Sequence, residues 1–395
     1  MSVRNGRDFL SIPGPTTVPD AVLNAMHRPA VDIYSGPLLA VTASCLEDLQ
    51  RIFRTRGQTY IYAANGHGAW EAALVNVLSR GDTLLALESG RFALGWGEMA
   101  AGLGVTMEKL PGSYRRAVDP AALETRLRAD KAGAIKAVLV VQVDTASGVV
   151  NDIAAIRKAI DRAGHGALLM VDTIASLGTM KFEMDGWGVD VAVSGSQKGL
   201  MLPPGLSFVA AGAKAKAAHQ TAGLRTPYWD WTAREGKEHY QKYCGTPPEH
   251  LLFGLRQSLD MLFEEGLDAA FERHRLLAEA VRRAVEEWSK GQALGFSVDD
   301  PAQRANSVTT ILMHNGRDPT PLLEFCEKKC GVVVGVGIGE LTGKAIRIAH
   351  MGHVNAPMVL GTLGVVETGL LALGIPHGKG GVQAAIDWLG RSVPV

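Results

Sequence analysis

The hydrophobic residues between about positions 59 and 210 form short apolar runs separated by stretches of helical periodicity. The apolar runs lie at 59–63, 83–87, 137–143, 167–171, 189–193 and 206–210. The helical stretches lie at 69–78, 95–103 and 153–163. Runs rich in Val and Leu are typical of strands that are buried on both faces. Strands that alternate with helices of this length predict βαβ units and a mostly parallel sheet.

The pattern changes after about residue 264. A long charged amphipathic helix is predicted at 267–288, two β-rich segments at 307–313 and 331–335, a strand at 345–349, and an apolar helix at 358–373. This succession is typical of a smaller α+β unit appended to the sheet. We therefore expect three parts: an N-terminal segment, residues 1–20, that packs on the small domain or on a partner subunit; a large domain, 21–264; and a small domain, 265–395.

The composition indicates a protein that acts on small molecules. Forty basic and forty acidic side chains cancel, so no excess of charge favours nucleic acid or an anionic membrane surface. The longest apolar runs fall far short of the roughly 18 residues that a membrane-spanning helix needs. The polar residues 1–10 lack the apolar core of a signal peptide, which favours the cytoplasm.

The four cysteines are too few to form a disulfide framework in a chain of 395 residues. Cys326 and Cys330 are four residues apart, but no further ligands lie near them at the spacing of a metal site. We therefore expect reduced thiols and no bound metal.

One lysine follows an apolar run and lies among small residues. It is Lys198 in the sequence SGSQKG at 194–199, and PPG at 203–205 closes this segment before the next apolar run. Small neighbours let a ligand approach closely, and burial lowers the pKa of a lysine and makes its amine nucleophilic. Taken alone, Lys198 is better explained as an exposed lysine on a turn, so its interpretation depends on the motifs around it.

Two other segments place polar groups at the ends of predicted strands. Asp172 ends the run at 167–171, where open α/β sheets bind ligands, although a helix cap explains an isolated Asp equally well. The sequence NGHG at 65–68 joins a strand to a helix, and the N–H groups of such a turn suit a phosphate. This turn lacks the Walker and dinucleotide patterns, and a simple strand–helix connection remains possible.

Together these motifs resemble the class V, fold-type I aminotransferases that depend on pyridoxal 5'-phosphate (PLP), specifically the alanine–glyoxylate and serine–glyoxylate group. The resemblance begins at 12–15 (IPGP) and runs nearly to the last helix. Its most specific pieces are Val171-Asp172 with ASLG at 175–178, SGSQKG with the following PPG, and TGK at 342–344 leading to Arg347. The resemblance implies a mostly parallel, seven-stranded-type sheet domain and a smaller C-terminal α+β domain.

The resemblance also implies a role for individual residues. Lys198 holds PLP as a Schiff base and moves the substrate proton, while Asp172 pairs with the pyridine nitrogen and Arg347 binds the substrate α-carboxylate. The remaining cofactor-binding positions are Asn65, Gly66, His67, Phe92, Thr145, Gln197, Tyr243 and Thr246. The last two match a segment that reaches the phosphate from a neighbouring subunit, which implies a homodimer with shared active sites. Tyr34 is expected at the substrate entrance.

The chain departs from the serine–glyoxylate pattern both at the predicted substrate entrance, in segment 32–35, and beside the predicted cofactor. Segment 32–35 reads DIYS where those enzymes have Asp-His-Arg-Ser, and 143–145 reads VDT where they have Asn-Glu-Thr. The expected reaction is transamination between serine, alanine or aspartate and a 2-oxo acid such as glyoxylate, with the donor and acceptor pair left open. Trp70 is expected to pack in the core, with contact to the cofactor as the alternative. His350 and His353 are expected to be structural, with contact to the substrate as the alternative.

Two other functions fit the sequence less well. A PLP-dependent lyase or desulfurase would use the same fold, but a desulfurase needs a nucleophilic Cys on a mobile loop, whereas Cys326 and Cys330 lie in a predicted helix. A PLP-binding protein without catalysis is disfavoured because Lys198, Asp172 and Arg347 are all present.

Overall fold

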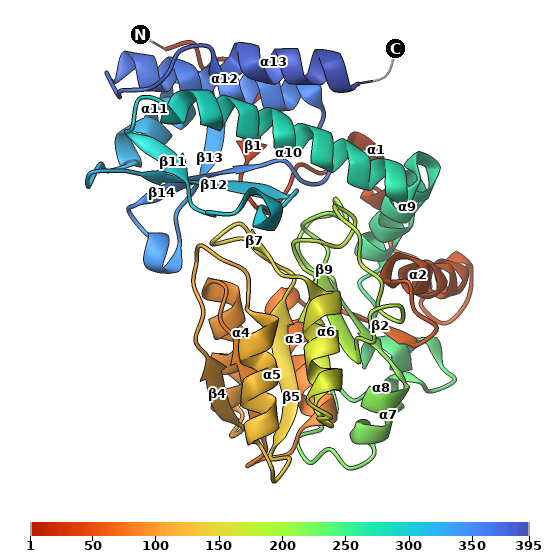
Figure 1. Ribbon diagram of the computed structural model, residues 1–395. Coiled ribbons are helices and arrows are strands. Elements are labelled where there is room, and N and C mark those ends of the chain that lie inside the picture. The colour runs from red at the N-terminus through yellow and green to blue at the C-terminus, as the bar shows by residue number, and fades with distance from the viewer. Residues whose placement is uncertain (1, 394–395) are drawn as a thin grey trace.

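A seven-stranded sheet forms the centre of the larger part of the computed structural model, which describes residues 2–393 (Figure 1). Its strands, in spatial order, are β2 (Gln58–Tyr62), β10 (Ser207–Ala211), β9 (Val191–Gly195), β8 (Leu168–Asp172), β5 (Ile135–Val141), β3 (Thr83–Leu87) and β4 (Thr106–Leu110). β10 runs antiparallel to both of its neighbours, and the pairs from β9 to β4 are parallel. The predicted mostly parallel sheet is therefore confirmed.

Both faces of this sheet are covered by helices, and successive residues of one strand pack on opposite faces. In β8, Leu168 and Met170 join the cluster under α3 (Gly66–Val77) and α4 (Arg91–Gly102). Leu169 and Val171 join the cluster on the other face. The helices there are α2 (Pro37–Phe53), α5 (Pro120–Ala129), α6 (Ile153–Arg162) and α9 (Glu249–Glu265). Burial on both sides explains why these strands are continuous apolar runs in the sequence.

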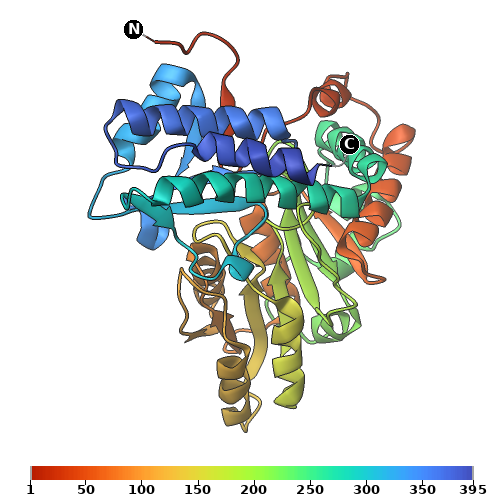
Figure 2. The same ribbon diagram turned by 45° about the horizontal axis from the view of Figure 1, so that its top comes forward.

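A second sheet of five strands lies at the other end of the molecule, in the order β1 (Phe9–Ser11), β13 (Val332–Val336), β14 (Ala345–Ala349), β12 (Val308–Met313) and β11 (Leu294–Phe296). Its apolar face packs against α10 (Leu267–Ser289), α11 (Thr320–Cys330), α12 (Ala356–Ala372) and α13 (Gly381–Ser392). Figures 1 and 2 show α10, α12 and α13 side by side over this sheet. Because β1 pairs in parallel with β13, the N-terminal residues are part of this second sheet.

The structure differs from the sequence-based prediction at two places in the large sheet domain. The predicted strand 137–143 is two strands, since β5 ends at Val141 and residues 143–144 (β6) pair with residues 149–150 (β7) in a short hairpin. The edge strand β4 was not predicted, because its partly exposed residues form no apolar run. The three-part division of the chain remains a prediction, and its outermost residues, 1 and 394–395, lie outside the described residues. No helix within residues 2–393 is long and apolar enough to cross a membrane.

Candidate active site

The carboxyl ends of the parallel strands meet at the edge of the large sheet that faces the second sheet (Figure 1). A cavity of about 220 Å³ lies there, at the place where open α/β sheets bind ligands. Asp172 at the end of β8 and Lys198, just after β9, both line it. Five more of the predicted cofactor-binding residues do the same: Gly66, His67, Phe92, Thr145 and Gln197. The volume suits a ligand with one ring better than a dinucleotide.

The amine of Lys198 is held against the N-terminal segment of the chain. Its Nζ donates a hydrogen bond to the carbonyl oxygen of Pro13. A Cβ at Gly14 would lie 2.5 Å from this Nζ, so only glycine leaves room for the amine. Burial, and after it the nearby positive charge of Arg347, lower the pKa of Lys198 to about 8, while the carboxylate of Asp172 opposes the change. A substantial fraction of the amine is therefore neutral and nucleophilic near pH 8.

The carboxyl group of Asp172 is buried and accepts two hydrogen bonds. Ile174 N–H donates to Oδ1 at 2.6 Å, and the indole Nε1–H of Trp70 donates to Oδ2 at 2.8 Å. The hydrogen bond from Ile174 N–H closes the local turn that a capping Asp makes. The side chain of Asp172 nevertheless also lines the cavity. Burial raises the pKa of Asp172 to about 7, although both hydrogen bonds oppose the rise.

The glycine-rich turn before α3 is capped by its own first residue. Asn65 Oδ1 accepts hydrogen bonds from His67 N–H at 3.1 Å and Gly68 N–H at 3.3 Å, so Asn65 holds the helix N-terminus. Across the cavity, Gln197 Oε1 is buried and has no hydrogen-bond partner among residues 2–393. A buried polar group without a partner is costly, and this amide would be satisfied by a polar ligand beside the helix N-terminus.

Arg347 comes from β14 of the second sheet and brings a buried cation towards the same edge. Its Nε donates to the carbonyl of Val336 at 2.6 Å and its Nη1 donates to the carbonyl of Thr145 at 2.7 Å. The residue is only 8% exposed, and burial lowers its pKa to about 10, with Asp144 opposing the shift. Two carbonyls orient the guanidinium but do not neutralise it, which leaves it suited to an anionic ligand.

Asp144 was not among the predicted site residues, yet it fixes one wall of the cavity. Its carboxylate accepts hydrogen bonds from Phe92 N–H at 2.8 Å and Ala93 N–H at 3.1 Å, at the N-terminus of α4. It also accepts from Ala146 N–H at 2.9 Å. A Cβ at Gly90 would lie within 2.2 Å of this carboxyl group. Asp144 therefore anchors the turn that presents Phe92 to the cavity.

Several other residues singled out in the sequence lie elsewhere in this chain. The side chain of Tyr34 is 69% exposed, and Thr246 is exposed as well. Tyr243 is buried, with its hydroxyl 2.8 Å from Thr42 Oγ1. His350 is buried between Thr309 and the carbonyl of Asn306, and His353 is exposed. None of these five lines the 220 Å³ cavity. Trp70 is buried, as expected of a core residue, and it also lines the cavity.

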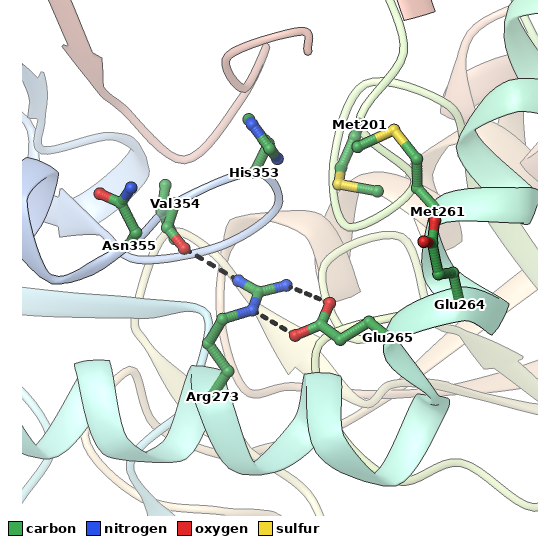
Figure 3. Close-up of a pocket in the computed structure, with 8 residues that line it drawn as sticks. All are labelled: Met201, Met261, Glu264, Glu265, Arg273, His353, Val354 and Asn355. Carbon is green, nitrogen blue, oxygen red and sulfur yellow. Dashed lines mark hydrogen bonds and ion pairs between the residues drawn. The ribbon is translucent and has the colours of Figure 1, made fainter. Parts of the chain in front are cut away.

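A larger cavity, about 410 Å³, lies beside the loop between β9 and β10 that carries Lys198 (the lysine loop), and it is lined by Met201, Met261 and Arg273 among others (Figure 3). Figure 3 shows the guanidinium of Arg273 between Glu265 and the carbonyl of Val354, which are its hydrogen-bond partners together with the carbonyl of Gly352. Because these hydrogen bonds occupy the guanidinium, Arg273 holds the segment at residues 352–354 in place and is not available to a ligand. The smaller cavity is therefore the candidate active site.

Several known proteins similar to this chain are aminotransferases by name. The family model for class-V aminotransferases matches residues 9–351. Serine–glyoxylate aminotransferase of Methylorubrum extorquens is 39% identical over 98% of this chain and 97% of its own. L-Aspartate–glyoxylate aminotransferase of Paracoccus denitrificans is 37% identical over 95% and 94%, respectively. The crystal structure of pyridoxamine–pyruvate aminotransferase from Mesorhizobium loti superposes with a TM-score of 0.90 at 26% identity and covers 100% of both chains.

The lowered pKa of Lys198 predicts an unusual pH dependence of its reactivity. Reductive methylation of Lys198 by formaldehyde should reach half of its maximal rate near pH 8, because only the neutral amine reacts and burial lowers the pKa from the ordinary 10.5 to about 8. Peptide mass spectrometry across pH 6–10 measures this rate, with the exposed Lys181 in the same digest as the reference. A rate for Lys198 that still rises steeply between pH 9 and pH 10 would contradict the prediction.

Proposed function

The chain belongs to the class-V aminotransferase family, and from this premise we propose that it is a PLP-dependent enzyme that transfers the amino group of a small amino acid to glyoxylate. The family that the sequence motifs indicated is thereby confirmed. The observation that carries the proposal is the pair Lys198 and Asp172, which face one cavity from the ends of two neighbouring parallel strands. An amine of lowered pKa beside a buried carboxylate is what a covalently held pyridine cofactor needs.

The residues of the 220 Å³ cavity fit PLP. Lys198 would hold the cofactor aldehyde, Asp172 would face the ring nitrogen, and Phe92 would lie against the ring. Gln197, which lines the same cavity, would offer its side-chain amide N–H to the phosphate. Gly66 and His67 would offer backbone N–H groups at the N-terminus of α3 to the phosphate. Thr145 would offer its hydroxyl to the cofactor ring. When bound, PLP supplies a ring that accepts the electrons left on the substrate Cα after a proton is removed.

The chain's own residues would position the substrate and move its proton. Lys198, once released from the cofactor, would take the proton from the substrate Cα, since its lowered pKa leaves the amine neutral near pH 8. Arg347 would bind the α-carboxylate, for which its planar, fork-shaped donor set is suited. The hydrogen bond from Arg347 to the carbonyl of Thr145 supports this assignment, because it ties the arginine to a residue of the cavity wall.

The choice of substrates rests on the relatives. Both the serine–glyoxylate and the aspartate–glyoxylate aminotransferases named above use glyoxylate by name and resemble this chain along nearly its whole length. We therefore propose glyoxylate as the acceptor and serine, alanine or aspartate as the donor.

We also propose that the enzyme works as a homodimer with shared active sites in the cytoplasm. Tyr34 and Tyr240 are exposed and lie edge to face, with ring centroids 6.2 Å apart. This aromatic pair joins segment 32–35 to segment 239–246, and an exposed pair of this kind supports an interface. Thr246 is exposed beside it and free to reach a partner's site. All four cysteines are free thiols, which agrees with a reducing compartment.

A desulfurase function finds no support in the geometry. Cys326 is buried within α11, and burial raises the pKa of its thiol to about 12. Cys330 lies at the end of the same helix. Neither residue lines the cavity, so a persulfide-forming thiolate is not placed beside the proposed cofactor site.

The proposed activity should be visible as glycine formed from glyoxylate. With PLP and one of serine, alanine or aspartate, the wild-type protein should produce glycine, and Lys198→Ala should lower turnover by about a thousandfold or more because it removes the proton-transferring amine. Chromatography of the amino acids measures both. Lys181→Ala, at an exposed position, is the matched control. Turnover of Lys198→Ala near the wild-type rate would refute the lysine assignment, and absence of glycine with every donor would refute glyoxylate.

Replacement of Arg347 by Lys should separate substrate binding from cofactor binding. The variant keeps the positive charge but loses the two-pronged geometry, so the KM for the amino donor should rise about tenfold while the affinity for PLP stays within about twofold. Steady-state kinetics and cofactor titration measure the two quantities. Arg282→Lys is the control, because Arg282 is also buried and bonded to carbonyls, those of Arg304 and Ala305. Equal losses of donor and PLP affinity would indicate a structural role for Arg347.

A further inference from the structure

The contact between Trp70 and Asp172 links two residues that are 102 positions apart in the sequence. Trp70 is the fifth residue of α3, is 1% exposed, and lines the candidate active site. Its indole N–H donates to Asp172 Oδ2 at 2.8 Å. A buried Trp needs an acceptor for its N–H, but a backbone carbonyl would serve that need. Here the acceptor is the one carboxyl group that faces the proposed cofactor.

The ring of Trp70 also touches the other walls of the cavity. Its centroid lies 4.5 Å from that of His67 and 6.3 Å from that of Phe92, which it meets edge-on. On its far side it stacks on Trp96, with centroids 6.0 Å apart and planes inclined by 16°. These contacts hold the indole in one orientation. Because the ring cannot turn freely, its N–H points at the carboxylate in a fixed direction.

The ionisation of the buried Asp172 carboxyl group depends on its hydrogen-bond donors. Within the described chain, Ile174 N–H binds Oδ1 and Trp70 Nε1–H binds Oδ2, one donor to each oxygen. A buried carboxylate is unfavourable unless it is hydrogen-bonded or paired. Burial raises the pKa of Asp172, and the hydrogen bonds from Ile174 and Trp70 both act in the opposite direction. Loss of the indole donor would leave Oδ2 without a partner and favour the protonated, neutral form.

We propose that Trp70 is a positioning residue of the enzyme: its indole N–H orients the carboxylate of Asp172 and keeps it ionised, so that Asp172 can pair with the protonated ring nitrogen of PLP. This inference rests on the proposed function, since it requires the cofactor. Trp70 itself acts through Asp172. Its effect must therefore depend on the presence of a ring nitrogen in the ligand.

That dependence gives a test by equilibrium binding. The variant Trp70→Phe keeps an aromatic ring and loses the N–H. We expect it to bind PLP about 10- to 100-fold more weakly than wild type, the range for loss of a hydrogen bond to a charged group, and to bind 1-deaza-PLP, which has a carbon in place of the ring nitrogen, with unchanged affinity. The matched control is Trp96→Phe, because Trp96 is buried in the same aromatic stack but donates its N–H to the carbonyl of Trp70. Trp96→Phe should leave the ratio of the two affinities at the wild-type value.

The outcomes distinguish the inference from the function on which it rests. Two results would overturn the role of Trp70 and leave the proposed function intact. In the first, Trp70→Phe weakens the binding of PLP and of 1-deaza-PLP by the same factor. In the second, Trp96→Phe changes the ratio of the two affinities as much as Trp70→Phe does. Failure of the wild-type protein to bind PLP would overturn both. Circular dichroism checks the fold of each variant, and if Trp70→Phe does not fold, Trp70→Leu, which also lacks the N–H, is measured with the same expected ratio.

Discussion

The amine of Lys198 and the carboxyl group of Asp172 are enclosed in one small cavity, and the rest of the candidate active site depends on this constraint. Either group alone would be strongly disfavoured in its charged form away from water. Side by side, Lys198 and Asp172 each moderate the shift in the pKa of the other. The surrounding hydrogen bonds satisfy both groups. The carbonyl of Pro13 accepts one from the amine, and Trp70 and Ile174 donate one each to the carboxylate. A pyridine ring with an aldehyde satisfies both groups at once.

The site also requires the two sheets to be held against each other at the lysine loop. Thr16, which follows β1 of the second sheet, donates its hydroxyl to the carbonyl of Lys198 at 3.0 Å. A Cβ on Gly352 would lie 3.2 Å from that same carbonyl, and Gly352 is in turn bonded to both Arg273 and His274 of α10. The larger cavity of Figure 3 thus marks a structural junction beside the lysine loop. Movement of the second sheet would shift the backbone of Lys198 directly.

The main chemical residues were predicted from the resemblance to the class V aminotransferases, and their places in the sequence agree with it. Asp172 ends one apolar run and Lys198 follows another, and parallel strands end at one edge of the sheet. Trp70 and Asp144 could not be assigned in this way, since their partners lie 102 and 52 residues away and no periodicity reports a contact between two elements. The roles proposed for Tyr243 and Thr246 require a second copy of the chain, which no pattern within one copy specifies.

Borohydride reduction of the PLP-loaded protein, followed by peptide mass spectrometry, identifies the side chain that holds the cofactor. The arrangement described above predicts one pyridoxyl group, on Lys198, and predicts that it is lost when serine, alanine or aspartate converts the cofactor to its amine form before reduction. A pyridoxyl group on any other lysine, or none on the protein, would contradict the assignment of the cavity between β8 and β9 as the active site.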